Sequence, residues 1–292
     1  MSKSMTNFKF HKFMIQIVSA VLVAGAPMLH AQSPDNKVTV PLTDPSRPVT
    51  VRAHLLNGGI TVKGADIKEV VVEARVRDHE GRGEGRGEGR GESRGESMKR
   101  IPMTSTGLNI EAENNEVRVS TDSVQRTIDL VITVPIHTSL SLRSVNDGNI
   151  SVTDVDGELD VNNVNGEVIL KNVSGSAVAH ALNGKVLVTF NRINPQKPMA
   201  FSSMNGAIDV TFPADLKATV SLRTDNGEVF SDFDIKLQAN EPQQTVEDDR
   251  GKGGKYRVKI DKTVRGSING GGQEIQFKNF NGSIYLRKAG AK

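Results

Sequence analysis

The stretch that decides the fold runs from Asn146 to Val188 and reads NDGNISVTDVDGELDVNNVNGEVILKNVSGSAVAHALNGKVLV. A glycine recurs in it every nine residues, each time after Asp, Asn or Ser, at Gly148, Gly157, Gly166, Gly175 and Gly184. Asn and Gly tolerate a positive φ, so each of these pairs predicts a sharp turn of the chain. The constant spacing is an internal repeat, which is typical of stacked architectures.

Apolar residues stand two and four positions after these glycines, as in Ile150 and Val152 or Val168 and Leu170. This alternation predicts short strands with one buried face. Asn-Gly between alternating runs also favours a β-hairpin, so a meander is the first alternative. The phase argues against a meander, because position six is polar and the next apolar residue comes at position seven. The position-seven residues are Val155, Val164, Val173 and Leu182, and we expect a bend before each that turns it inward.

The stronger turns, at Asn165, Asn183, Asn205 and Asn226, follow one another at spacings of 18, 22 and 21 residues. We therefore predict an all-β protein, a parallel β-helix-like β-solenoid with coils of about 18–22 residues stacked at the inter-strand distance of roughly 4.8 Å. Eight glycines are expected to form its structural turns: Gly148, Gly157, Gly166, Gly175, Gly184, Gly206, Gly227 and Gly282.

Residues 1–31 have the layout of a secretory signal peptide. Three lysines precede an apolar run from Phe13 to Ala26, and small residues follow near Ala31. The run is shorter than the roughly 20 apolar residues of a membrane span, although an uncleaved anchor is the alternative because Leu29 suits a cleavage site poorly. We expect a cleaved leader, no transmembrane span after cleavage, and a periplasmic, outer-envelope-associated or secreted protein.

Charge and cysteine content exclude several classes of function for the mature chain. The leader holds three lysines and no carboxylate, so its removal takes the net charge from +3 to zero. A neutral exported chain lacks the positive field that nucleic-acid binding requires, and we expect no nucleic-acid partner. The chain has no Cys, which excludes disulfides, a lipoprotein anchor and Cys-based metal or redox sites.

One segment differs from the rest in composition. Residues 80–97 read EGRGEGRGEGRGESRGES, a Gly-Arg-Gly-Glu repeat without an apolar side chain. We expect a disordered insert there, within a single β-solenoid domain over residues 38–288. Residues 91–95, GESRG, match the G-x-S-x-G pattern of a catalytic serine, but that motif requires a strand, a tight turn and a helix, which this segment lacks.

The repeat unit itself resembles a known family. The pattern N-G-x-Φ-x-V is followed by N-V-N-G at 163–166 or N-V-S-G at 172–175, and an Ile-Thr-Val-Pro segment precedes it at 132–135. This combination resembles the bacterial "putative adhesin" family of exported or envelope-associated β-strand-repeat proteins, over roughly residues 38–288 and most closely over 128–233. The resemblance implies a β-solenoid and brings no catalytic residues. The insert at 80–97 departs from the family pattern.

Metal and enzyme chemistry find little support in the sequence. Calcium-binding β-rolls need G-G-x-G-x-D, whereas Gly148 and Gly157 stand singly, so the acidic residues from Asp147 to Asp160 are interpreted as solvated turn carboxylates. A glycan-cleaving site needs paired carboxylates and usually an aromatic platform. All nine aromatic residues after the leader lie at or after Phe190, and Phe190, Phe212 and Phe230 are spaced like stacked core positions. We expect no catalytic residue, metal or cofactor.

Two further sets of polar residues bear on function. The histidines after the leader, His54, His79, His137 and His180, have no spacing that favours a metal site or a catalytic triad, and His180 is expected at an outward corner. A basic strip is interpreted either as a solvated strand face or as a site for an anionic envelope partner. It consists of Arg250, Lys252, Lys255, Arg257, Lys259, Lys262 and Arg265.

These observations favour an exported, non-enzymatic, adhesin-like β-solenoid that contacts a cell-envelope or surface partner. Its contacts would be repeated outward side chains such as Asn149, Ser151, Glu158, Asp160 and Glu167. Two alternatives remain: a carbohydrate-active lyase or hydrolase on the same scaffold, and an envelope-stress sensor with a protein partner.

Overall fold

Short β-strands make up all the regular structure in the described part of the chain. The computed structural model describes residues 37–44, 46–77, 107–121, 126–238, 244–248, 256–260 and 263–290. The strands are β1 (Lys37–Pro41), β2 (Val49–Asn57), β3 (Ile60–Ala65), β4 (Glu69–Val76), β5 (Leu108–Glu113), β6 (Glu116–Thr121), β7 (Ile128–Pro135), β8 (Thr138–Asn146), β9 (Ile150–Thr153), β10 (Asp156–Asn165), β11 (Val168–Asn183), β12 (Val186–Ile193), β13 (Met199–Asn205), β14 (Ile208–Phe212), β15 (Ala218–Asn226), β16 (Val229–Ser231), β17 (Ile235–Leu237), β18 (Gln244–Asp248), β19 (Tyr256–Ile260), β20 (Val264–Ile268), β21 (Gln273–Asn281) and β22 (Ile284–Lys288).

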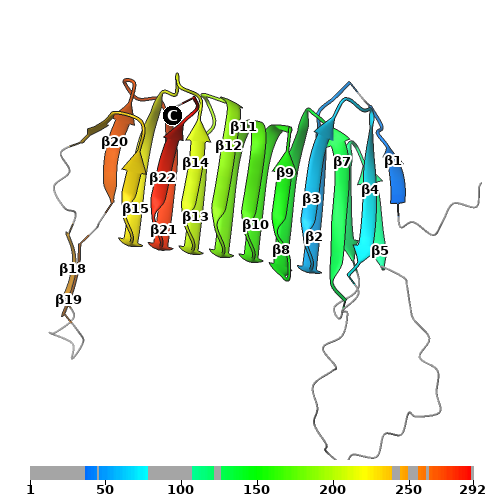
Figure 1. The fold of residues 1–292 in the computed structure, drawn as a ribbon, viewed down its shortest axis with the longest axis horizontal. Helices are drawn as coiled ribbons and strands as arrows, with labels where there is room; N and C mark the ends of the chain where they lie inside the picture. The colour runs from blue at the N-terminus through cyan, green and yellow to red at the C-terminus, as the bar shows by residue number, and fades with distance from the viewer. Residues whose placement is uncertain are drawn as a thin grey trace, which may run out of the picture. The chain divides into compact units, whose positions relative to one another are not determined.

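The strands pair into two walls that share one core. Wall A follows the order β5-β6-β2-β8-β10-β11-β13-β21-β15-β20-β17. Wall B follows the order β1-β4-β7-β3-β9-β11-β12-β14-β22-β16. The sixteen-residue β11 contributes its first residues to wall B and its last to wall A. The rows of neighbouring strands are visible in Figure 1. Strands β18 and β19 form a separate antiparallel pair.

One coil consists of a wall A strand, an Asn-Gly turn, a wall B strand and a bend back to wall A. The parallel register of β10 with β11 joins Asn165 to Asn183, a coil of 18 residues, and that of β11 with β13 joins Asn183 to Asn205, a coil of 22. The predicted β-solenoid with coils of 18–22 residues is therefore confirmed.

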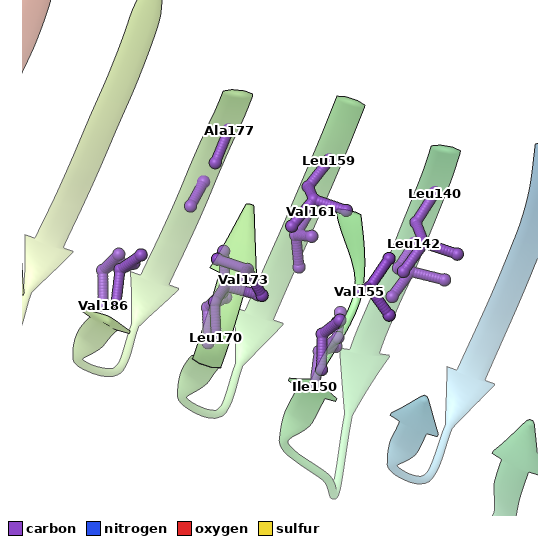
Figure 2. Close-up of a cluster of buried hydrophobic side chains, with 14 of the residues drawn as sticks. Leu140, Leu142, Ile150, Val155, Leu159, Val161, Leu170, Val173, Ala177 and Val186 are labelled. Atoms are coloured by element: carbon purple, nitrogen blue, oxygen red, sulfur yellow. The ribbon is translucent and has the colours of Figure 1, made fainter. Parts of the chain in front are cut away.

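The bend is made by a residue in the left-handed conformation. Asp154 has φ 58° and Asn172 has φ 54°, which Asp and Asn tolerate better than other non-glycine residues. The residue after each bend, Val155 or Val173, is fully buried, as the phase of the repeat predicted. Figure 2 shows both valines within the cluster of buried hydrophobic side chains.

The same prediction is wrong for Val164 and Leu182, which are only half-buried. The buried residues there are Asn163 and Ala181, one position earlier. The reason is that, of the four position-six residues, Asp154 and Asn172 have a positive φ, whereas the strand before each Asn-Gly turn, with Asn163 or Ala181, stays extended. Alternation then continues to the turn and places the apolar residue at position seven on the outer face.

The order of the coils also departs from the order of the sequence. Asn205 and Asn226 were expected in consecutive coils, but β21 pairs with β13 on one side and with β15 on the other. Likewise β22 pairs with both β14 and β16. The later segment β21–β22 thus lies between the β13–β14 coil and the β15–β16 coil, as Figure 1 shows.

The core consists of Val, Ile and Leu from both walls, with a group of four phenylalanines among the later coils. Phe190 and Phe212 stack at 5.5 Å between ring centroids, and Phe201 and Phe277 at 5.3 Å. Phe190 and Phe212 therefore confirm the predicted core positions. Phe230 does not, because it lies on the outside of β16 and is 46% exposed.

The glycines of the turns and bends allow the coils to approach closely. Gly175 has φ 103°, and a Cβ at this position would collide with the carbonyl oxygen of Gly157 in the preceding coil. Other side chains would therefore be strained and obstructed there. The predicted signal peptide (residues 1–31) and the insert at 80–97 lie outside the described residues.

Candidate binding surface

A ladder of asparagine side chains runs along the turns at the end of wall A. Each amide Nδ2 donates to the Oδ1 of the asparagine in the neighbouring coil, with N···O distances of 2.8–3.3 Å. In stacking order the ladder is Asn57, Asn146, Asn165, Asn183, Asn205, Asn281 and Asn226. These asparagines are therefore structural, and they fix the register of every coil at this edge.

A second set of hydrogen bonds lies just inside the ladder. The residue two positions before most ladder asparagines donates to the carbonyl oxygen of a turn residue in the preceding coil of the stack. The donors are Ser144 to Gly58 (2.7 Å), Asn163 to Gly148 (2.9 Å), Ser203 to Gly184 (2.9 Å), Asn279 to Gly206 (2.8 Å) and Thr224 to Gly282 (3.0 Å). These side chains satisfy carbonyl groups that would otherwise lose water at the edge of the core.

The residue immediately before each ladder asparagine points outward, and in six successive coils of wall A it is apolar. We call this row the apolar stripe: Leu56, Val145, Val164, Leu182, Met204 and Phe280. Leu56, Met204 and Phe280 are 40%, 44% and 45% exposed, and the other three are half-buried. The stripe includes Val164 and Leu182, the two residues that the sequence pattern placed in the core.

A row of hydrogen-bond donors runs beside the apolar stripe, two residues earlier in each strand. We call it the donor row: His54, Arg143, Asn162, His180, Ser202 and Lys278. It contains no carboxylate. Arg143 has a long ion pair, 3.9 Å, to Asp160, and Lys278 has no ion-pair partner among the described residues.

His180 lies within this donor row, on a strand rather than at the predicted corner. Its Nδ1 lies 2.7 Å from the Ser202 hydroxyl oxygen. Partial burial lowers the pKa of His180 below its ordinary value, so the imidazole is neutral at neutral pH. A Ser-His pair alone is not a catalytic triad, because the histidine also needs an orienting acid and the reaction an oxyanion site.

The outward acidic residues of the sequence prediction are engaged in separate contacts. Glu158 pairs with Lys197 at 3.0 Å, Asp160 with Arg143, and Glu167 with Lys185 at 4.0 Å. Asn149 is structural, because its Oδ1 accepts the backbone N–H of Glu167 at 2.8 Å. Ser151 lies half-buried on wall B. Among the described residues, no three acidic, His or Cys side chains come together in a group that could hold a metal ion.

One cavity of about 430 Å³ opens on the hairpin β5–β6 and is lined in part by Glu111, Glu113, Glu116 and Arg118. The Glu116 carboxylate is not suited to proton donation. Glu116 accepts bonds from Arg118 and Arg52 at 2.8 Å each, and the bond to Arg118 is the main reason that its pKa lies below the ordinary value. An ionised carboxylate held in this way cannot serve as a general acid at neutral pH.

The basic strip lies mostly outside the described residues, which include the backbone of Arg257 and Lys259 on β19 and all of Arg265 on β20. Arg265 is half-buried on wall A. An aromatic group lies on wall B: Phe230 stacks on Tyr285 at 5.1 Å, and the Arg287 guanidinium lies 5.4 Å from the Tyr285 ring centroid. The sequence pattern placed Phe230 in the core. It did not predict this cross-strand pairing, which depends on the β16–β22 register.

Comparison with known proteins agrees with this architecture. The family described as Toastrack DUF4097 matches residues 33–269, more than half of the chain. The chain belongs to this family. The adhesin-like resemblance and the β-solenoid that the sequence predicted are thereby confirmed. No curated protein matches the sequence.

Two solved structures are similar to this Toastrack DUF4097 protein. A "putative cell adhesion protein" from Clostridium sporogenes is 9% identical with a TM-score of 0.42, covering 87% of this chain and 99% of that one. A "putative adhesin" from Bacteroides fragilis is 12% identical with a TM-score of 0.32, covering 86% of this chain and 95% of that one. Neither likeness is close enough to carry an argument about function. Within the described residues, no helix has the length and hydropathy to cross a membrane.

Proposed function

We propose that this protein is an exported, non-enzymatic, adhesin-like β-solenoid that binds a component of the cell envelope or of a cell surface. The observation that supports this best is the outer face of wall A, where the same kind of side chain recurs coil after coil. The apolar stripe and the donor row repeat in six neighbouring coils, and half of the residues in each row are exposed while the others are half-buried. A repeated exposed face is suited to binding an extended partner, as in other solenoid proteins.

The chemistry of the described surface also favours binding over catalysis. Enzymatic acid–base work needs convergent groups with pKa values moved toward neutrality. Here many of the carboxylates are in separate ion pairs along the walls, and Glu116, Glu73 and Asp44 have pKa values below their ordinary range. The signal-peptide layout of residues 1–31 supports export and hence an envelope or external partner.

The test is binding of residues 32–292 to whole bacterial cells and isolated envelopes at low and high salt. A variant with Leu182→Glu and Met204→Glu places charge on wall A, and the matched control, Ile169→Glu with Leu187→Glu, places the same charge on the half-buried outer positions of wall B. We expect cell binding to be lost only with the wall A variant. Equal binding by both variants, or no binding by the parent chain, contradicts the proposal.

The basic strip is part of the same proposal, as a second contact with an anionic envelope component. Its test is reversal of the charges at Arg250, Lys252, Lys255, Arg257, Lys259, Lys262 and Arg265, with salt-sensitive binding lost on reversal. A parallel incubation with envelope polysaccharides measures the release of reducing ends. Release of reducing ends by the purified chain would overturn the non-enzymatic assignment in favour of a carbohydrate-active enzyme.

A further inference from the structure

We infer that the apolar stripe of wall A is the binding line for an acidic linear polysaccharide that runs along the stack of coils, across the strands. This inference rests on the proposed function and names the class of partner. It concerns Leu56, Val145, Val164, Leu182, Met204 and Phe280, together with the donor row beside them.

The apolar stripe is distinct from the other outward rows of the same wall. All six of its residues are apolar, whereas the donor row contains none. The row four residues before the stripe contains two apolar residues, Val178 and Ala200. Its other members are Arg52, Ser141, Asp160 and Gln276. Exposed apolar residues scattered singly are normal on protein surfaces, but a continuous line of them marks an interaction site. The uninterrupted line therefore calls for a ligand.

The geometry of the stripe fits a ligand that is itself a repeating chain. Six neighbouring strands spaced by about 4.8 Å extend the stripe over roughly 24 Å, while its width is a single side chain. Sugar rings present apolar C–H faces that pack on such side chains, and a linear polymer offers one after another. Contacts repeated along one chain add up, because each further contact is made without a new loss of translational freedom.

The narrow width argues against a lipid bilayer as the partner. Membrane-binding surfaces bury a broad apolar face among the headgroups, whereas here polar rows flank the stripe on both sides. On one side is the donor row. On the other is the asparagine ladder, in which Asn165, Asn183 and Asn205 each use one amide N–H for the ladder and have a second. Hydrogen-bond donors on both sides of an apolar line match the hydroxyl and carboxylate oxygens of a glycan.

The positive charge of the donor row favours a partner with negative charge. Arg143 and Lys278 are cations of the donor row, and no carboxylate shares that row with them. A second copy of this chain would bring the same cations against themselves, which disfavours self-association through this face. Uronic acid units, which carry one carboxylate per sugar, provide the complementary charge.

The test uses isothermal titration calorimetry of residues 32–292 with oligogalacturonates and hyaluronan oligosaccharides from two to six sugars, and with cellohexaose as the neutral comparison. We expect the acidic hexamers to bind at least tenfold more tightly than the corresponding dimers, and more tightly than cellohexaose. Binding that does not depend on length, or no binding to either acidic series, overturns the inference. If cells still bind in that case, the proposed function stands without it.

Matched variants separate the stripe from the rest of the wall. Leu182→Ser with Met204→Ser is expected to weaken hexamer binding at least tenfold. The control is Val178→Ser, on the same strand β11 and 47% exposed but outside the stripe, and it should leave binding unchanged. Arg143→Gln with Lys278→Gln should remove the preference for acidic over neutral hexamers. Equal losses in the control and the stripe variant contradict the inference.

Vesicles of phosphatidylglycerol serve as the competing partner in the same experiments. We expect no co-sedimentation of the chain with them. Vesicle binding that the Leu182→Ser and Met204→Ser changes abolish, together with absent glycan binding, would assign the stripe to a lipid surface instead.

Discussion

Position 181 is one of two exceptions among the buried residues just inside the asparagine ladder; the other is Leu55, in the first coil of the ladder. Five equivalent side chains donate to a turn carbonyl of the neighbouring coil, but Ala181 has no group to donate. Ala181→Ser should allow the new hydroxyl to reach the Gly166 carbonyl oxygen and raise the free energy of unfolding by about 0.5–1.5 kcal/mol. Urea unfolding followed by circular dichroism measures the change. The reverse substitution, Ser203→Ala, should lower it by about 1–3 kcal/mol, and equal stability of all three proteins contradicts the assigned role.

Gly175 is a residue where backbone conformation and coil contact act together. Gly175→Ala combines an unfavourable φ of 103° with a collision against the Gly157 carbonyl. Gly270 has a similar φ of 89°, and a Cβ added there would have nothing within 4 Å, so Gly270→Ala isolates the cost of conformation. We expect Gly175→Ala to lower the thermal midpoint clearly more than Gly270→Ala. Similar losses from both would mean that coil contact adds nothing at Gly175.

His180 gives the stability a dependence on pH. Burial lowers its pKa in the folded protein, so the unfolded chain binds the proton more readily. Stability is therefore unaffected well above the unfolded pKa of about 6.5 and falls as the pH drops below it. The urea midpoint should fall between pH 7.5 and pH 5 by more in the parent chain than in His180→Gln. An equal fall in both would assign the pH dependence to other groups.

At the scale of elements, the sequence determines the coil but not which side chains face the core near the turn. Asn-Gly pairs and period two predict the strand and the turn correctly, because both are local properties. The sequence pattern placed Val164 in the core, because apolar side chains are usually buried and polar ones exposed. In the structure Asn163 is buried and Val164 faces outward, which is the reverse of that preference. Asn163 is stabilised inside by hydrogen bonds from its Nδ2 to the carbonyl oxygens of Gly148 (2.9 Å) and Glu167 (3.2 Å). Gly148 lies in another coil, and a single sequence does not display that partner. The candidate surface was missed for the same reason.

The segment β21–β22 departs most from the expectation that coils stack in the order of the sequence. Its removal should do more than shorten the stack, because β13, β14, β15 and β16 all pair with it. In a chain that ends after Gly272, we expect fast amide hydrogen exchange over β13–β16 and retained protection in β8–β10. Hydrogen exchange with mass spectrometry measures both. Preserved protection in β15 and β16 would contradict the paired arrangement.

At the scale of the whole molecule, apolar packing and backbone pairing hold the described structure together. The ion pairs of Arg52, Arg118, Arg192 and Arg287 involve guanidinium groups that are more than half exposed, and such pairs contribute little to stability. The free energy of unfolding should therefore change by less than about 2 kcal/mol between 0.1 M and 1 M NaCl. Chemical denaturation at the two salt concentrations measures it, and a larger loss would point to electrostatic stabilisation. Polysaccharide binding, in contrast, should weaken strongly over the same range.

The position of β21–β22 in the stack also affects how the chain folds during synthesis. Residues 273–288 are synthesised after residues 218–231, yet they occupy the space between those residues and the preceding coil. Until they arrive, β13 and β15 expose unpaired strand edges that can join other chains. Coil-by-coil folding during synthesis must therefore pause at this point. Aggregation through these edges is therefore favoured until residues 273–288 have been added.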